Sequence, residues 1–513
     1  MEYLVGIDVG TSGTKTVLFD TEGKKIAGKM IEYPLHAPHP AWAEQDPKDW
    51  WEACKKSLRY VTSKVDTSKI RGVSLSGQMH GSVFLDRNNQ VIRNCILWCD
   101  GRTHKECDEI YRRVGRAKFH RWTANPALTG FTAPKVLWLR NNEPANFRRL
   151  ETLVLPKDYI RYLLTGEICM EVSDAAGTVL FDVAKREWCA PLMKALDLDM
   201  SILPPVLESQ EVAGTVTKEA ARATGLKEGT PVIAGGADNT CGAIGTGVVK
   251  EGRVLCSLGT SGIIFAPSGT MRRDPSLGLH SFCHSVPNVW YLMGCMLSAG
   301  MSLRWFRDRM AGEETAQAQR RKTDVYDILM EKAQTAPLGS EGLIFLPYLM
   351  GERSPHGNPH AKGVFFGLTF RHGKEHIIRA IIEGVTFGLL DSLEICRDLK
   401  VKIGEIRATG GGARSKFWLQ TLADVFGKEV VTVNTEEGPA LGAALLAGVG
   451  AGVYPSVIEA TDQVVKVTGS FKPDRKRHSA YREQYELFHS LYPLLKDSFA
   501  EVSSLVEKQR KKR

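Results

Sequence analysis

The stretch Gly10-Thr11-Ser12-Gly13 recurs as Gly259-Thr260-Ser261-Gly262, and this repeat decides how the chain is interpreted. Each copy lies between two short apolar runs typical of strands, so each predicts a β-hairpin with a glycine-flanked turn. Glycines permit positive φ and expose backbone N–H groups, which together with the Thr and Ser hydroxyls suit an anion such as phosphate. The flanking runs are Tyr3–Ile7 and Thr16–Phe19 for the first copy, and Val254–Leu258 and Ile263–Ala266 for the second.

One such turn is also common in ordinary hairpins, so a single copy would carry little weight. Two copies, separated by about half of a chain of 513 residues, predict a duplicated domain whose turns clamp a nucleotide triphosphate tail between them. The length agrees, because this chain exceeds the size at which one hydrophobic core stops growing. We therefore expect two domains, residues 1–249 and 250–513, with the crossover near Lys250–Arg253.

Composition excludes several classes of protein. Hydrophobic residues make up 43% of the chain and charged residues 24%, and no run approaches the roughly 20 apolar residues of a membrane span. The N-terminus leads straight into a strand with Glu2 and Asp8, so we expect no secretory signal and a cytoplasmic protein. Eleven cysteines without a Cys-x-x-Cys pair indicate reduced thiols rather than disulfides or zinc.

The charge distribution gives no reason to expect a nucleic-acid partner. The net charge of +9 is modest for this length, and part of it sits in the basic tail, residues 508–513. Such a tail favours a frayed, solvated end over a nucleic-acid arm.

Strand-like runs alternate with helical stretches in both halves, which predicts an α/β fold. The expected strands that precede candidate site residues are Gly72–Ser76, Pro231–Gly236, Glu405–Thr409 and Glu429–Val433. The expected helices are Trp50–Val61, Lys157–Leu164, His376–Arg397, one that begins near Gly438, and one or two between Ser479 and Lys508.

Two carboxylates follow predicted strands. Asp8 stands two residues before the first turn, where it can hold Mg²⁺ through water while the turn holds phosphate; it could equally bond its own turn backbone. Asp238 leaves a buried strand through two glycines, where α/β folds place reactive groups. It can accept the proton of an attacking hydroxyl, or it can simply cap the following helix.

Three further features suit a sugar and a nucleotide. Gln78-Met79-His80-Gly81 combines an amide, an imidazole and an apolar side chain, as a polyol site requires, although a lone histidine is commonly structural. Gly410-Gly411-Gly412 lets an adenine or ribose approach the backbone, or marks an ordinary turn. Lys15 either neutralises phosphate or is an exposed strand residue.

Taken together, these residues resemble the FGGY family of carbohydrate kinases. Gly6–Ser12 is similar to the family's first phosphate loop, Gly130–Leu139 to its first signature and Gly363–Glu383 to its second. Ser76–Gly81 resembles in particular the members that phosphorylate xylulose. The resemblance extends from about residue 3 to about residue 450.

The resemblance implies two ribonuclease-H-like (actin-like ATPase) domains that face an interdomain cleft. It implies ATP-dependent phosphorylation of D-xylulose to D-xylulose 5-phosphate with Mg²⁺, and a homodimer. Asp238 would be the catalytic base, and Met79, His80, Asp238 and Asn239 would bind the sugar. Nucleotide contacts are implied at Thr11, Ser12, Gly13, Lys15, Thr260, Gly300, Gly411, Gly412 and Ser415, and a metal contact at Asp8.

Two alternatives stay open at this point. The same scaffold could act on another polyol such as ribulose or L-xylulose, because a few pocket side chains select the sugar and the fold does not. The repeat could also belong to an actin-like nucleotide-dependent switch whose output is a protein partner.

Overall fold

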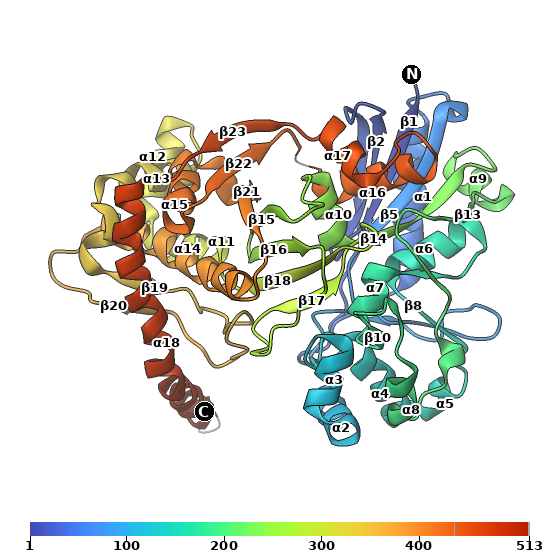
Figure 1. The fold of residues 1–513 in the computed structure, drawn as a ribbon, viewed down its shortest axis with the longest axis horizontal. Coiled ribbons are helices and arrows are strands. Elements are labelled where there is room, and N and C mark those ends of the chain that lie inside the picture. Colours follow the sequence, from blue (N-terminus) through green and yellow to red (C-terminus); the bar gives the residue numbers. More distant parts are fainter. Residues whose placement is uncertain (436, 511–513) are drawn as a thin grey trace.

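The computed structural model describes residues 1–435 and 437–510. Two lobes lie side by side, each built around one large sheet (Figure 1). The first sheet has the order β13 (Val212–Thr215), β14 (Pro231–Ala237), β5 (Ile70–Gly77), β1 (Tyr3–Val9), β2 (Gly13–Asp20), β3 (Lys25–Glu32). The second has the order β17 (His280–Cys283), β18 (Trp290–Met296), β16 (Gly262–Ser268), β15 (Gly252–Leu258), β21 (Ile403–Thr409), β22 (Glu429–Val433), β23 (Val467–Phe471).

The two sheets repeat one topology. Antiparallel hairpins, β1–β2 and β15–β16, carry the two Gly-Thr-Ser-Gly turns, so the hairpin prediction is confirmed. Each hairpin gains a third antiparallel strand on one side, β3 or β18. On the other side it gains two parallel strands, β5 and β14 or β21 and β22. This order in both lobes confirms the duplicated ribonuclease-H-like α/β fold.

Alternate residues of β1 face two different layers of helix, as the two-residue period of a strand requires. Val5 and Ile7 share a core with α1 (Pro47–Thr62) and α6 (Pro156–Thr165), whereas Leu4 packs with α16 (Gly438–Gly450). Gly6 also faces α16, and a Cβ there would lie 1.9 Å from the Ala440 carbonyl oxygen. Only a glycine therefore lets this helix approach the strand so closely.

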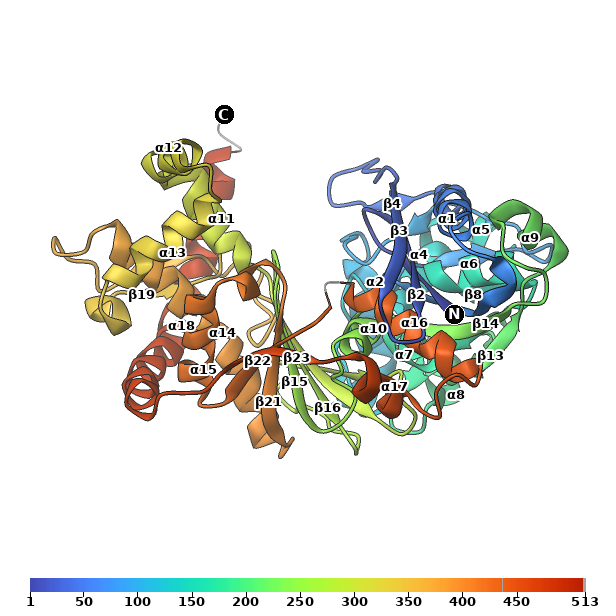
Figure 2. The same cartoon turned by 90° about the horizontal axis from the view of Figure 1, so that it is seen from above.

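Helices α16 and α17 (Val457–Val464) come between β22 and β23 of the second sheet in sequence, yet they lie in the first lobe (Figure 2). The chain thus returns to the first lobe before it ends. The division between residues 249 and 250 stays a prediction.

The second sheet also uses its two faces differently. Val254 and Cys256 share a core with the buried helix α14 (Lys374–Asp398) and with α15 (Lys416–Phe426). Leu255 and Phe265, on the opposite face, share a core with Phe131 and its neighbours in the first lobe. One apolar core therefore continues from one lobe into the other.

The remaining elements are short. The helices are α2 (His104–Val114), α3 (Arg116–Thr123), α4 (Thr132–Asn142), α5 (Pro144–Phe147), α7 (Val172–Gly177), α8 (Ala190–Leu196), α9 (Lys218–Thr224), α10 (Asp238–Gly245), α11 (Gly300–Met310), α12 (Gly312–Arg321) and α13 (Val325–Thr335). The paired minor strands are β4 (Glu44–Gln45) with β7 (Cys95–Ile96), β6 (Val83–Leu85) with β8 (Thr152–Val154), β10 (Phe181–Asp182) with β11 (Glu187–Trp188), β12 (Val206–Leu207) with β9 (Met170–Glu171), and β19 (Ile344–Leu346) with β20 (Val364–Phe366).

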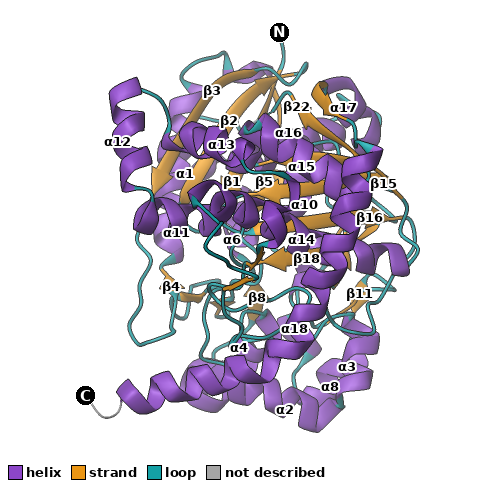
Figure 3. Cartoon of the chain, turned by 90° about the vertical axis from the view of Figure 1, so that its left-hand side faces the viewer, coloured by secondary structure: helices purple, strands orange, loops and turns teal. Residues whose placement is uncertain are grey.

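The C-terminal stretch forms one long helix, α18 (Arg475–Arg510), which continues through Pro493 and leads away from the sheets (Figure 3). Residues 508–510 of the basic tail belong to this helix, and residues 511–513 lie outside the described part of the chain. All cysteines are free, and all but Cys99 and Cys295 are buried. Within residues 1–435 and 437–510, every helix is too short or too polar to cross a lipid bilayer.

Candidate active site

Asp238 stands at the junction of β14 and α10. The strand end is held by Ser173, whose Oγ accepts the Ala237 N–H at 2.9 Å, and Asp238 Oδ1 accepts the Asn239 N–H at 2.7 Å. Burial, followed by the charge of Asp8, raises the pKa of Asp238 to about 7. A carboxyl that titrates near neutral pH is suited to accept a proton from a hydroxyl. The residue that precedes α10 is Ala237, so the helix-capping alternative for Asp238 is wrong.

Asp8 lies inside β1, opposite Lys15 of β2. Burial raises the pKa of Asp8, and its Oδ1 has no hydrogen-bond partner among the described residues. A buried carboxylate oxygen without a donor fits Mg²⁺, which takes few protein ligands and keeps several waters. Lys15 is 37% exposed and pairs with Glu437, at the start of α16. This lysine therefore links β2 to the segment that returns from the second lobe.

The first Gly-Thr-Ser-Gly turn is fixed from several sides. A 3.1 Å hydrogen bond from its first glycine N–H to the carbonyl of its last closes the turn. Thr11 Oγ1 donates to Gln78 Oε1 at 3.0 Å and accepts from Trp98 Nε1 at 2.9 Å. Ser12 is exposed, and Gly13 begins β2. Trp98, which no sequence pattern singles out, thus joins the turn to the loop that follows β7.

The four residues expected to bind sugar gather in the first lobe. Met79 is buried just beyond the end of β5, and its sulfur accepts a hydrogen bond from Asn239 Nδ2 at 3.6 Å. Asn239 follows Asp238 in α10, so the methionine lies beside the candidate base. His80, the next residue, is half-buried.

The His80 ring has a defined protonation pattern. Its Nδ1 lies 2.7 Å from the carbonyl oxygen of Gly177. Because a carbonyl only accepts, Nδ1 carries the proton in the neutral ring and Nε2 is left as an acceptor. Burial lowers the pKa of His80 well below its usual value, which keeps the ring neutral. An acceptor nitrogen on a partly apolar surface suits a sugar hydroxyl.

The second turn is built into the start of α11. The Thr260 carbonyl accepts the N–H groups of Ala299 and Met301, each at 3.1 Å, and the Gly259 carbonyl accepts the Gly300 N–H at 2.9 Å. A Cβ on Gly300 would lie 2.5 Å from the Gly259 carbonyl oxygen. Glycine is therefore required where the helix meets the turn.

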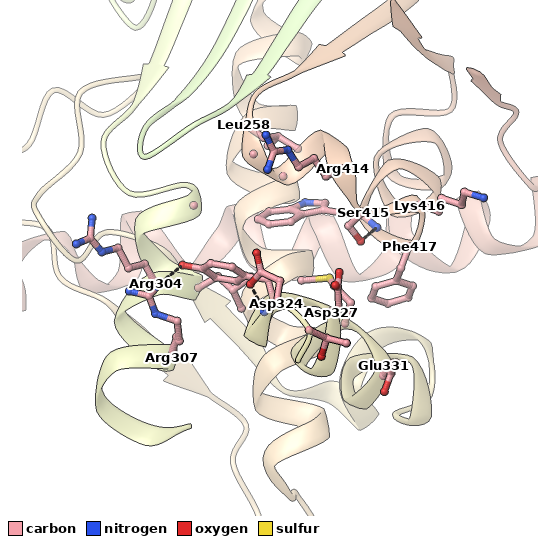
Figure 4. Close-up of a pocket in the computed structure, with 18 of the residues that line it drawn as sticks. Leu258, Arg304, Arg307, Asp324, Asp327, Glu331, Arg414, Ser415, Lys416 and Phe417 are labelled. Carbon is pink, nitrogen blue, oxygen red and sulfur yellow. Dashed lines mark hydrogen bonds between the residues drawn. The ribbon is translucent and has the colours of Figure 1, made fainter. Parts of the chain in front are cut away.

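The expected nucleotide residues of the second lobe line one cavity of about 1000 Å³. These residues are Thr260, Gly300, Gly411, Gly412 and Ser415. In Figure 4 the cavity is flanked on one side by Arg304 and Arg307 and on the other by Ser415, Lys416 and Phe417.

Apart from Gly300, sequence reasoning missed the part of this cavity that α11 and α13 supply. Arg304 and Arg307 come from α11, and Asp327 and Glu331 from α13 (Figure 4). Arg307 donates to the Tyr326 hydroxyl at 3.0 Å. Neither helix carries a glycine motif, and the only sequence signal is a local concentration of arginine.

A second cavity, of about 600 Å³, reaches the candidate base. Asp238 and Asn239 line it from α10, and Gly438 lines it from the start of α16. Gly411 and Arg414 line both cavities, so the two spaces adjoin. Asp8, residues 11–13, Lys15, Met79 and His80 line neither cavity.

Comparison with known proteins identifies the family of this chain. Residues 3–245 match the N-terminal domain, and residues 254–451 the C-terminal domain, of the FGGY family of carbohydrate kinases. The chain is 40% identical to a curated xylulose kinase of Escherichia coli over 96% of its own length and 99% of the relative's.

Two solved structures from Lactobacillus acidophilus are similar over 98% of this chain. One is a ligand-bound xylulose kinase, covered completely, with a TM-score of 0.91 and 29% identity. The other is a gluconate kinase, 99% covered, with a TM-score of 0.91 and 30% identity. With matches to both domains and a relative of this identity over nearly its whole length, the chain belongs to the FGGY family of carbohydrate kinases.

Proposed function

We propose that this protein transfers the terminal phosphoryl group of ATP to the terminal hydroxyl of D-xylulose, giving D-xylulose 5-phosphate and ADP. One observation supports the proposal above the others: the half-buried Asp238 carboxyl lines a cavity that adjoins the glycine-lined cavity of the second lobe. The relatives named xylulose kinase support the choice of sugar.

The sugar would lie in the first lobe against Met79 and Asn239, with one hydroxyl donating to His80 Nε2. Its terminal hydroxyl would face Asp238, which accepts the proton as the new O–P bond forms. The transition state of phosphoryl transfer is loose, so the position of the base matters more than its strength.

The nucleotide would place its adenine near Gly411, Gly412 and Ser415 and its phosphates between the Thr260 and Thr11 turns. Asp8, with an oxygen that lacks a donor, would hold Mg²⁺ through water. When bound, the metal neutralises charge on the phosphates. Lys15 would contribute a further positive charge beside the first turn.

Because the first turn, Met79 and His80 line neither cavity, the proposal requires the lobes to close on the substrates. Closure excludes water from the reacting phosphate, whose attack would otherwise waste ATP. We therefore expect weak ATP hydrolysis in the absence of sugar.

The test is ADP release measured with D-xylulose, L-xylulose, D-ribulose and gluconate, each against a sugar-free control. We expect D-xylulose to give the highest kcat/KM. A higher value for another compound would reassign the substrate. Gluconate belongs in the panel because one of the similar solved structures is a gluconate kinase. Absence of stimulation by every compound would overturn the proposal in favour of a nucleotide switch.

A companion variant tests the sugar site. His80→Ala should raise KM for D-xylulose by about tenfold or more, because a neutral acceptor and its apolar contact are lost, and leave KM for ATP within about twofold. Equal losses for both substrates would make His80 structural.

The proposal extends to a homodimer in the cytoplasm. Sedimentation equilibrium at assay concentration tests the assembly, and a monomer would remove that part without affecting the chemistry.

A further inference from the structure

His80 has a backbone conformation that needs outside support. Its φ is +66°, in the left-handed region that non-glycine residues rarely adopt. Such strain persists where the surrounding structure enforces it, and it concentrates at functional sites. The contacts that enforce it at His80 are therefore of interest.

The carbonyl of His80 is held by two donors from α4. Lys135 Nζ donates to it at 2.7 Å, and Thr132 Oγ1 donates at 3.2 Å. Lys135 also donates to the Gly130 carbonyl at 2.8 Å. These three residues belong to the stretch Gly130–Leu139, which the proposed chemistry leaves without a role.

Lys135 is an unusual residue to find in this place. Its side chain is fully buried, and in the described part of the chain its Nζ is paired with two carbonyl oxygens and with no carboxylate. Burying an ammonium group without a carboxylate is costly. A residue that only filled space in α4 would be apolar, as Val136 and Leu137 are. The lysine is therefore retained for its hydrogen bonds.

The imidazole ring of the same histidine is held from a second helix. Gly177, at the end of α7, accepts from His80 Nδ1 at 2.7 Å. The Ala133 N–H donates to the Thr178 carbonyl at 3.0 Å and joins α4 to the end of α7. His80 is thus fixed at its carbonyl by one helix and at its ring by the other, and the two helices are bonded to each other.

We propose that Lys135 is a positioning residue for sugar binding: it anchors the His80 carbonyl so that Nε2 of the ring faces the polyol. The inference rests on the proposed function, in which His80 binds sugar. Lys135 itself touches neither the sugar nor the reacting atoms.

Burial is the largest influence on the pKa of Lys135 and lowers it to about 7. Among its charged and titratable neighbours, Cys95, Asp100 and Cys99 raise this pKa, and Arg102 lowers it. The neutral amine still has two N–H donors for its two carbonyl partners. Anchoring therefore depends on the donors and not on the charge.

The test compares Lys135→Met, which keeps the length of the side chain, with Lys135→Gln, which restores two N–H donors. Lys135→Met should raise KM for D-xylulose by about tenfold and leave KM for ATP within about twofold. Lys135→Gln should recover part of the loss. Thr132→Val, which removes the second donor, should shift the sugar KM in the same direction but less.

Thr224→Val is the matched control. Thr224 is buried in α9 and donates to the Ala220 carbonyl at 2.6 Å, away from the sugar site. The Thr224→Val variant should have a lower melting temperature than the wild type and an unchanged KM for D-xylulose. If Lys135→Met lowers the melting temperature and either raises both KM values equally or leaves both unchanged, the lysine is structural and the proposal is overturned.

Calorimetric titration with D-xylulose in the absence of ATP separates the two levels of the proposal. If the wild-type protein neither binds nor phosphorylates the sugar, the proposed function fails. If the wild type binds, His80→Ala weakens binding and Lys135→Met does not, only the role of Lys135 fails. If Lys135→Met does not fold, the other two variants decide the question. The role of Lys135 is overturned if Lys135→Gln and Thr132→Val both bind the sugar as tightly as the wild type.

Discussion

Replacing Asp238 with asparagine removes a charge while keeping the shape of the side chain, so it tests the base separately from the scaffold. In the wild-type protein the Asn239 N–H donates to Asp238 Oδ1 at 2.7 Å, and the amide oxygen of the variant can accept the same hydrogen bond. Turnover should fall by about 10² or more, because an amide accepts no proton from the sugar hydroxyl. KM for ATP should stay within about twofold.

The same substitution should stabilise the protein at neutral and alkaline pH. The pKa of Asp238 is about 7 in the folded chain against 3.8 for a free aspartate side chain, so the folded state holds this proton to higher pH than the unfolded state. The penalty for burying the charge is absent below about pH 4 and grows by about 1.4 kcal/mol per pH unit up to pH 7. Above pH 7 it is constant at about 4 kcal/mol at most, less where water reaches the carboxyl.

The assay is thermal and urea unfolding of wild type and Asp238→Asn between about pH 5 and about pH 8. The stability difference in favour of the variant should widen up to pH 7 and then level off. Asp497→Asn, on the exposed side of α18, is the control and should show no such trend. A variant that is no more stable than wild type at pH 8 would refute the buried-charge reasoning. Near-normal turnover would remove Asp238 from the role of base.

Two glycine substitutions should separate the two substrates. In Gly177→Ala the new methyl would lie 3.2 Å from ring atoms of His80, so KM for D-xylulose should rise several-fold with little change for ATP; an unchanged sugar KM would contradict this. In Gly300→Ala the methyl would lie 2.5 Å from the Gly259 carbonyl oxygen, so KM for ATP should rise instead, and a selective sugar defect would contradict the layout. Gly312→Ala, with nothing within 4 Å, is the control for both.

The duplicated framework could be predicted because it is written in local patterns. Strand periodicity on both sides of Gly10–Gly13 and Gly259–Gly262 specifies two hairpins, and each hairpin starts a sheet with the same strand order. The small-residue run from Gly438 specifies a helix in the same way. Such patterns report which face of an element is apolar and where a turn must be glycine.

The patterns do not report which surface an apolar face will meet. Nothing local to α16 indicates that it returns to pack on β1, or that Gly6 is small because Ala440 lies over it. The anchoring of His80 is likewise invisible, because Lys135 and Gly177 come from two segments remote in sequence. The identity of the candidate site residues could be inferred from the resemblance, but their supports required coordinates.

The packing of α10 on α16 places the candidate base and the start of a second helix on one cavity. A Cβ on Gly245 would lie 1.9 Å from the Gly438 carbonyl oxygen, and one on Gly442 would lie 1.8 Å from that of Cys241, so the two helix backbones are nearly in contact. Both helices begin at the cavity that contains the candidate base, with Asp238 and Gly438 as their first residues. Helix N-termini carry free N–H groups and a partial positive charge that favour phosphate. The close contact itself joins the first residue of α16 to Gly245, the last residue of α10, so the two N-termini lie at different places on the wall of this cavity. The cavity thus has a helix N-terminus suited to a phosphoryl group at Gly438 and a carboxyl suited to a hydroxyl at Asp238.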